Sequence, residues 1–216
     1  MGQAIVACID DQPDLALSGV WTRGGDLDTV VASCDVMIDF SLPEATTGIL
    51  EAILRHKRPL VCGVSGLSPT QLAALDQAAT RVPIVYDRNM SLGVAVLERA
   101  VRQAAAALGP DFVVEIAETH HIHKKDAPSG TALKLGEAIA EARGESGTGS
   151  VHFEVERRGE VPGDHEVVMR SASERLTFAH SVTNRRVFAE GAVRAARWVV
   201  QQAPGHYRMG DVLLEH

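Results

Sequence analysis

Short apolar runs alternate with helix-like segments from Met1 to Met90, and this alternation constrains the fold more than any other feature of the sequence. The runs at 36–40 and 59–62 are typical of buried strands, because they are apolar and end at small or polar residues. The expected strands span 17–22, 36–40, 59–62 and 82–86, and the expected helices span 1–9, 26–33, 41–56 and 68–80. Alternation at this spacing predicts right-handed βαβ units and a parallel sheet covered on both faces.

Two of these helices carry start signals. Ser41 is expected to cap the helix that ends near His56. Ser68 is followed by a proline and then by Gln71, which is the spacing of a capping box.

Ligands of parallel sheets bind beyond the carboxyl ends of the strands. In this chain those ends fall at 22–23, 40–41, 63–66 and 87–90, where small and polar residues gather as a dinucleotide site requires. Loops of α/β proteins are rich in Gly and Ser in any case, so this signal is weak by itself.

The pattern of expected helices and strands changes after Ser91. A long amphipathic helix at 92–108 stops at Gly109, a strand follows at 112–117, and Ser129 is placed to cap a helix that ends near Arg143. Three strand-like segments come next, at 151–157, 165–170 and 174–182, and a last helix is expected at 187–202. Successive strands predict an antiparallel or mixed sheet. We therefore expect a first domain formed by 1–90 and 188–216 and an α+β second domain formed by 91–187.

The segment 118–135 concentrates titratable groups. His120, His121, His123, Lys124 and Lys125 fall within six positions, directly before a turn and a helix start. Imidazoles exchange protons near neutral pH, and a helix N-terminus attracts anions, so an active-site loop is favoured. Solvated surface and a metal site are the alternatives. Alternating side-chain directions along an extended segment suit a three-histidine metal site poorly.

Composition excludes several classes of protein. The chain has 216 residues and a formal net charge of −7, which disfavours nucleic acid or an anionic membrane as the main partner. Cys8, Cys34 and Cys62 are too few for a disulfide framework and are expected to be buried thiols. No apolar stretch reaches the length of a membrane span, and no signal peptide is visible. These features indicate a soluble cytoplasmic protein.

The motif E-T-H-H-I-H-K-K-D-A-P-S-G-T-A resembles the dihydrodipicolinate reductase family. The motifs I-D-F-S-L-P-E-A, G-V-S-G, N-M-S-L-G-V, G-D-H-E-V and R-R-V-F-A-E-G-A-V-R-A-A support the resemblance in the same order, over nearly the whole chain. The resemblance implies a Rossmann-like domain that binds NADH or NADPH, and a second domain that binds a cyclic dicarboxylate and builds a homotetramer. The implied reaction reduces 4-hydroxy-tetrahydrodipicolinate in lysine and diaminopimelate biosynthesis.

The resemblance also implies roles for individual residues. His120 would donate or accept a proton and Lys124 would be a second proton donor, while Arg157 would reach a substrate carboxylate. The residues implied to bind substrate are His121, Gly130 and Thr131. The residues implied to line the cofactor are Met1, Thr22, Arg23, Gly63, Val64, Ser65, Asp87, Arg88, Asn89 and Met90.

This chain departs from the family at its start. The family begins with a strand and the loop G-A-x-G-R-M-G, and this sequence begins at the Met-Gly of that loop. A start site assigned to an internal Met would explain the difference. A naturally short product would be expected to bind NAD(P)H weakly.

The loop after the expected strand at 17–22 also departs from the family. Folds that prefer NAD place an acidic residue there, and this chain has Thr22 and then Arg23. A guanidinium suits the 2′-phosphate of NADPH, so NADPH is favoured. A surface role for Arg23 is the alternative.

Two other function classes compete with the reductase. One is a non-catalytic relative that acts as an oligomeric ligand-binding protein, and the other is a His-cluster metalloprotein. The retained His120, Lys124, Gly130 and Thr131 favour the reductase.

Overall fold

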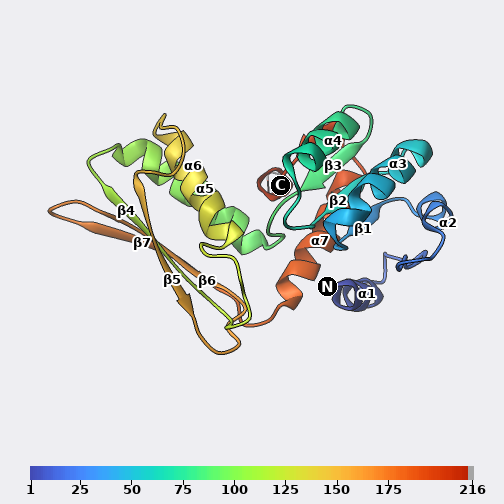
Figure 1. The fold of residues 1–216 in the computed structure, drawn as a ribbon, viewed down its shortest axis with the longest axis horizontal. Helices are drawn as coiled ribbons and strands as arrows, with labels where there is room; N and C mark the ends of the chain where they lie inside the picture. The colour runs from blue at the N-terminus through green and yellow to red at the C-terminus, as the bar shows by residue number, and fades with distance from the viewer. Residues whose placement is uncertain (214–216) are drawn as a thin grey trace. The chain divides into compact units, whose positions relative to one another are not determined.

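The computed structural model describes residues 1–213 and divides the chain into two compact units. Unit 1 contains Met1–Ser91 and the chain from Arg186 onwards, and unit 2 is Leu92–Arg185. Figure 1 shows each unit as helices packed on one sheet. No helix within residues 1–213 has both the length and the apolar character needed to cross a membrane.

Unit 1 is a four-stranded parallel sheet in the order β1-β2-β3-β8. Its strands are β1 (Met37–Asp39), β2 (Leu60–Cys62), β3 (Pro83–Tyr86) and β8 (Gly205–Tyr207). Its helical segments are α1 (Gly2–Asp10), α2 (Leu27–Ser33), the 3-10 turn η1 (Pro43–Ala45), α3 (Thr46–His56), α4 (Pro69–Ala79), α7 (Arg186–Val199) and α8 (Met209–Val212). The predicted Rossmann-like parallel sheet is confirmed.

Helices cover both faces of this sheet because successive strand residues point to opposite sides. Met37 packs into a core that α2, α3 and α4 share, with Ile53 and Leu75 at its centre. The next residue, Ile38, packs into a second core between α1 and α7, around Ile5 and Val193.

The capping predictions had different outcomes. The capping box at the start of α4 is confirmed: Ser68 Oγ accepts the Gln71 N–H at 3.3 Å, and Gln71 Oε1 accepts the Ser68 N–H at 2.9 Å. The prediction for Ser41 is wrong. The chain first forms η1, and the Ser41 N–H instead donates to Asp39 Oδ1 at 2.8 Å.

The prediction of a strand at 17–22 is also wrong. That segment runs between α1 and α2 without joining a sheet, and Leu17 and Val20 are exposed. Its composition suits a strand, but a strand forms only against a partner, and β1 pairs with β2 alone. Conversely, β8 and α8 were not predicted, because Gly205–Tyr207 is too short and polar to show a period and becomes a strand by pairing with β3.

Unit 2 is a mixed sheet in the order β5-β4-β6-β7. Its strands are β4 (Val113–His120), β5 (Val151–Arg157), β6 (Asp164–Arg170) and β7 (Arg175–Ser181). β4 pairs parallel with β5 and antiparallel with β6, and β6 pairs antiparallel with β7. The predicted mixed sheet is confirmed.

Two helices, α5 (Leu92–Leu108) and α6 (Gly130–Ala142), lie along one face of this sheet (Figure 1). Val101 of α5, Leu135 of α6 and Ile116 of β4 meet in a fully buried core. The start of α6 follows from its cap, since Ser129 Oγ accepts the Ala132 N–H at 3.2 Å.

β4 continues three residues beyond the predicted end at Ala117. The extension has a partner on each side: His120 is in register with Arg157 of β5, and Glu118 with His165 of β6. His120 therefore stands on a central strand, whereas the sequence had indicated a loop.

Candidate active site

The side chains on the helix-covered face of β4 change from apolar to ionisable along the strand. Val114 and Ile116 are fully buried, and Glu118 and His120 follow at the same two-residue spacing with 2% and 7% of their surface exposed. Residues two apart on a strand share a face, so a carboxylate and an imidazole are carried into the edge of the hydrophobic core. Buried ionisable groups need partners, and this pair has them.

Glu118 accepts hydrogen bonds from three parts of unit 2. The Arg157 guanidinium binds both carboxylate oxygens, at 2.9 and 3.0 Å. The Ser129 N–H, at the start of α6, donates to Oε1 at 3.0 Å. His120 Nδ1 makes a short contact with Oε2. Burial raises the pKa of this carboxyl, but the hydrogen bonds from Arg157 and His120 outweigh that effect and hold it below its usual value.

Only one ring nitrogen of His120 contacts a hydrogen-bonding group of the described residues. Nδ1 contacts Glu118, and Nε2 makes no hydrogen bond to the residues that the structure describes. Burial lowers the pKa of the imidazole, and Glu118 raises it in opposition. The net pKa is below the ordinary value for histidine, so the ring is mainly neutral at pH 7 and can take up or release a proton at Nε2.

Arg157 also ties the loop after β4 to the sheet. Its Nε donates to the Lys124 carbonyl at 3.4 Å, and its Nη2 donates to the Asp126 carbonyl. Within this loop the Lys124 ammonium lies 2.8 Å from Asp126 Oδ1, with 22% of the lysine side chain exposed. Lys124 is therefore held close enough to His120 for its charge to lower the imidazole pKa. Arg157, which the family resemblance directs to a substrate carboxylate, is fully engaged by the protein's own oxygens.

The remaining residues implied to bind substrate lie in the same unit. Gly130 and Thr131 form the first turn of α6, where backbone N–H groups and the helix dipole favour an anion. His121 follows β4 directly, and its Nδ1 is buried without a hydrogen-bond partner among the described residues. His123 is turned to solvent with 71% of its side chain exposed.

Two residues of the G-D-H-E-V motif complete the surroundings of His120. The His165 ring meets the His120 ring edge-on, with centroids 5.1 Å apart, and burial lowers its pKa to about 3. Gly163 has φ +152, and a Cβ there would lie 3.0 Å from His120 Nε2. A side chain at 163 would press on the atom that is available for proton transfer.

Within the residues that the structure describes, the histidines of segment 118–135 do not gather into a group that could hold a metal ion. Across residues 1–213, no group of three or more His, Cys, Asp or Glu side chains is placed to hold a metal ion. His120 is turned inward to a carboxylate, whereas His123 points to solvent.

The residues implied to line the cofactor lie in unit 1, and most of them share one edge of the parallel sheet. The register aligns Asp39, Cys62 and Tyr86 at the carboxyl ends of β1, β2 and β3. The loops 63–66 and 87–90 therefore emerge side by side. Backbone bonds tie each loop to the end of the neighbouring strand, since the Gly63 N–H donates to the Asp39 carbonyl and the Asp87 N–H to the Cys62 carbonyl.

Some side chains at this edge are buried and support the loops, and others are exposed. Asp87 is buried, and its carboxylate accepts the Asn89 N–H at 3.3 Å and the Met209 N–H at 3.2 Å. Val64 and Met90 are buried as well, while Ser65 and Arg88 are exposed. The backbone of these loops and their exposed side chains are thus the groups that a ligand can reach.

The same edge holds one orphaned buried atom that sequence reasoning missed. Asp39 is 97% buried, and its Oδ2 has no hydrogen-bond partner within residues 1–213. Burial raises the pKa of its carboxyl. A buried polar atom without a partner at the ligand-binding edge fits an edge that receives a hydrogen-bonding cofactor.

Three other residues implied to line the cofactor stand apart from these loops. Met1 is the N-cap of α1, and Thr22 and Arg23 lie in the exposed turn after 17–22. The turn is closed by the Gly25 N–H, which donates to the Thr22 carbonyl at 2.9 Å. No hydrogen bond joins these three residues to loops 63–66 or 87–90 in the part of the chain that the structure describes.

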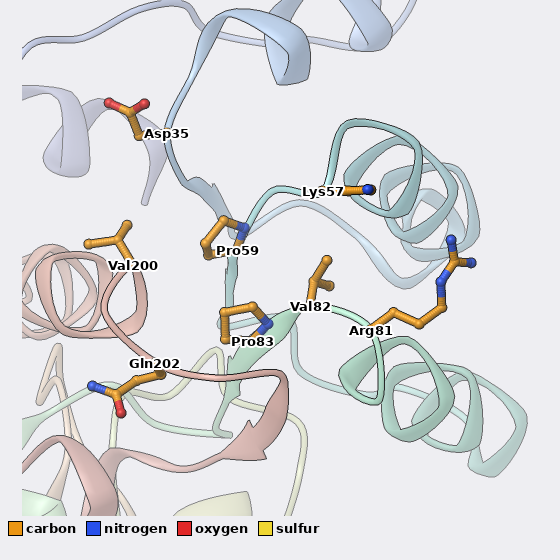
Figure 2. A pocket seen from close by; sticks show the side chains of 8 residues that line it. All are labelled: Asp35, Lys57, Pro59, Arg81, Val82, Pro83, Val200 and Gln202. Carbon is orange, nitrogen blue, oxygen red and sulfur yellow. The ribbon is translucent and has the colours of Figure 1, made fainter.

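A pocket of unit 1 lies at the opposite edge of its sheet (Figure 2). Pro59 and Pro83 stand at the amino ends of β2 and β3, and Asp35 precedes β1. In Figure 2 the Lys57 and Arg81 side chains extend to the side away from Asp35. The pocket contains none of the residues implied for substrate or cofactor.

Sequence reasoning missed Glu118, Gly163 and His165 as parts of the site. A signal for Glu118 was present, because a carboxylate two positions before a histidine on a strand shares its face. Gly163 and His165 meet His120 through the β4–β6 pairing, which the sequence does not display.

Comparison with known proteins matches the sequence of both units to one family. The family described as dihydrodipicolinate reductase, N-terminus, matches residues 1–90, and the corresponding C-terminus family matches residues 93–213. A 4-hydroxy-tetrahydrodipicolinate reductase from Zymomonas mobilis is 42% identical, with 99% of this chain and 92% of the relative covered. One from Alkalilimnicola ehrlichii is 45% identical, with 88% and 77% covered.

Solved structures show the same fold. Dihydrodipicolinate reductase from Paenisporosarcina sp. TG-14, solved with dipicolinate bound, has a TM-score of 0.79 at 22% identity and covers 99% of this chain and 95% of its own. The DAP dehydrogenase of C. glutamicum has a TM-score of 0.61 at 12% identity and covers 100% of this chain and 93% of its own. From the two matched halves and the relatives above 40% identity, the chain belongs to the dihydrodipicolinate reductase family.

Proposed function

We propose that this protein reduces 4-hydroxy-tetrahydrodipicolinate to tetrahydrodipicolinate with NAD(P)H, as a step of lysine and diaminopimelate biosynthesis. The observation that carries the proposal is the cluster at the end of β4. There His120, Lys124 and the first turn of α6 are held around one buried carboxylate, Glu118. The names of the curated relatives support the same activity.

The substrate is a cyclic dicarboxylate, and unit 2 offers groups that suit it. The N–H groups of Gly130 and Thr131 open α6 and favour one carboxylate. We propose that the Lys124 ammonium and the His121 ring supply further donors to the substrate. Because Arg157 is already engaged by Glu118 and two carbonyls, we assign it to holding the loop rather than to the substrate.

The protein's chemical task in this reaction is a proton transfer. A reduced nicotinamide supplies the hydride that adds to the substrate ring, which leaves an enamine that needs a proton. His120 can deliver it from Nε2, because Nδ1 is held by Glu118. Lys124 is the second candidate donor.

For the cofactor we propose the carboxyl-end edge of the unit 1 sheet. Loop 63–65, with the exposed Ser65, and loop 87–90, with the exposed Arg88, would hold it. We propose NADPH over NADH because the exposed Arg23 guanidinium suits a 2′-phosphate. The ratio of kcat/KM for the two cofactors, measured for the wild type and for Arg23→Ala, tests this choice. A preference for NADH in the wild type, or an unchanged ratio in the variant, contradicts it.

We also propose a homotetramer in the cytoplasm, built through the sheet of unit 2. One face of that sheet is covered by α5 and α6. The other face carries charged side chains, among them Glu115, Glu166, Arg170 and Arg175. Sedimentation equilibrium checks the assembly, and a monomer at micromolar concentration would exclude it.

The decisive experiment follows NADPH oxidation with substrate generated in place by the preceding synthase. His120→Ala and Lys124→Ala are expected to lower kcat by about 100-fold, as loss of a general acid does. His123→Ala is the matched control, since His123 belongs to the same loop and is exposed. Wild-type protein that binds dipicolinate without turnover would favour a non-catalytic ligand-binding relative.

A further inference from the structure

We propose that Glu118 is the positioning residue for His120. It accepts the Nδ1–H of the imidazole, fixes the ring on β4 and leaves Nε2 as the atom that carries the transferable proton. The inference rests on the proposed reductase function, in which His120 touches the substrate.

The backbone makes the pairing obligatory. Glu118 and His120 are two positions apart on the central strand of the sheet, between β5 and β6, and both point to the helix-covered face. Glu118 cannot turn away without breaking pairs on both sides, and His120 cannot turn away without breaking its pair with Arg157. The carboxylate side chain is 0% exposed, so water does not compete for its oxygens.

The other donors to Glu118 decide which partner holds the proton. Arg157 binds both oxygens and the Ser129 N–H binds one of them, and each of these groups can only donate. A carboxylate that accepts three hydrogen bonds from two such groups stays ionised and is an acceptor for His120. The neutral ring is therefore the Nδ1–H tautomer, with its lone pair on Nε2.

The charged and titratable groups that face His120 come from three elements besides its own strand. They are Lys124 from the loop, Arg157 from β5 and His165 from β6. Both cations lower the pKa of His120, and Glu118 is the group that raises it. Removal of the Glu118 charge must therefore lower the pKa of His120 further.

These contacts define the proton-transfer step. In the protonated ring, the N–H bond at Nε2 breaks as the enamine electron pair forms a C–H bond. The electrons of the N–H bond remain on Nε2, and the ring returns to the neutral Nδ1–H form that Glu118 already holds. Glu118 thus stabilises the charged ring before transfer and orients the neutral ring after it.

The test compares Glu118→Gln and Glu118→Asp with a matched control, Glu98→Gln. Glu98 is also a largely buried carboxylate of unit 2, and its ion pair with Lys134 at 2.8 Å makes no contact with His120. Histidine ring nitrogens of the full chain are followed by 15N NMR across pH, and kcat and KM are measured across the same range.

In wild-type protein we expect the Nδ1–H tautomer of neutral His120. Glu118→Gln should lower the pKa of His120 by about one unit or more. It should also lower kcat by about 100-fold with KM changed by less than about threefold, and move the alkaline limb of the rate profile to lower pH. Glu118→Asp retains the charge and should restore most of the pKa, while Glu98→Gln should change stability and leave the His120 titration unmoved.

The inference is overturned if Glu118→Gln folds and leaves the tautomer and titration of His120 unchanged. If that variant does not fold, the wild-type tautomer and the Glu118→Asp titration decide, and a wild-type Nε2–H tautomer contradicts the proposal. Absence of substrate reduction by wild-type protein would refute the proposed function instead, and the NMR measurement separates the two failures.

Discussion

His165 should make the stability of unit 2 depend on pH. The residue is 3% exposed, and burial lowers its pKa from 6.5 to about 3. Between these two values the unfolded chain binds a proton that the folded chain does not. The contribution of His165 to the free energy of unfolding is therefore fully present above pH 6.5 and is lost as the pH drops towards 3.

The size of the effect follows from the same two values. At about 1.4 kcal/mol for each pH unit, the gap between 6.5 and about 3 corresponds to about 5 kcal/mol. Between pH 6 and pH 4.5 the expected loss is about 2 kcal/mol from this residue alone. Buried His120 and half-buried His180, whose pKa values are also lowered, add to the slope in the same direction. A domain is typically stable by about 5–15 kcal/mol, so the effect is large enough to measure.

Urea unfolding at a series of pH values measures it. The two tryptophans, Trp21 and Trp198, lie in unit 1, so their fluorescence reports on that unit, while far-UV circular dichroism reports on both. His165→Gln should make the pH slope of the unfolding free energy shallower by up to about 1.4 kcal/mol per pH unit. His152→Gln, at an exposed position of β5, is the control and should leave the slope unchanged. An identical slope in wild type and His165→Gln would refute the reasoning.

Two further substitutions test the packing of unit 1. Gly191→Ala should prevent stable folding of unit 1, because the new Cβ would lie 1.8 Å from the Met90 carbonyl oxygen. Gly210→Ala is the control and should be tolerated, because a Cβ there would have nothing within 4 Å. Equal melting temperatures for the two variants would contradict this prediction. Ser68→Ala should destabilise unit 1 by about 1 kcal/mol through loss of the capping box, and urea unfolding followed by tryptophan fluorescence checks it; an unchanged midpoint would show that the cap contributes nothing.

Segments whose structure is set locally were predictable from the sequence. The long helix was predicted at 92–108, which are the bounds of α5, and the Ser129 and Ser68 caps were predicted from residue type and spacing. In each case the apolar period or the cap lies within the segment itself. Such a helix or cap can therefore be recognised without knowledge of its tertiary contacts.

Segments whose structure depends on a neighbour were not predictable. The chain at 17–22 has strand-like residues and no strand beside it, whereas Gly205–Tyr207 lacks an apolar period and becomes β8 because β3 accepts it. The extra length of β4 has the same origin. Whether a segment becomes a strand depends more on a neighbouring strand than on its own β-propensity. A single sequence therefore does not determine such elements.

The candidate site divides in the same way. His120 and Lys124 stand out through their chemistry, and their roles come from the family resemblance. Gly163 and His165 are brought to His120 by strand pairing across more than forty positions of sequence. Arg157 illustrates the converse, because its guanidinium is directed to Glu118 by the parallel register of β5.

The placement of Glu118 and His120 on a central strand has a mechanical consequence. A shift of β4 by one residue would turn both side chains to the opposite face of the sheet. Local loosening of the site is thus prevented unless the ladders to β5 and β6 open as well, so the amide hydrogens of this segment should exchange among the slowest in unit 2. The position of the His120 ring therefore depends on the cooperative pairing of the whole sheet. Substitutions that weaken β5 or β6 far from His120 should first disturb the alignment of its ring with Glu118.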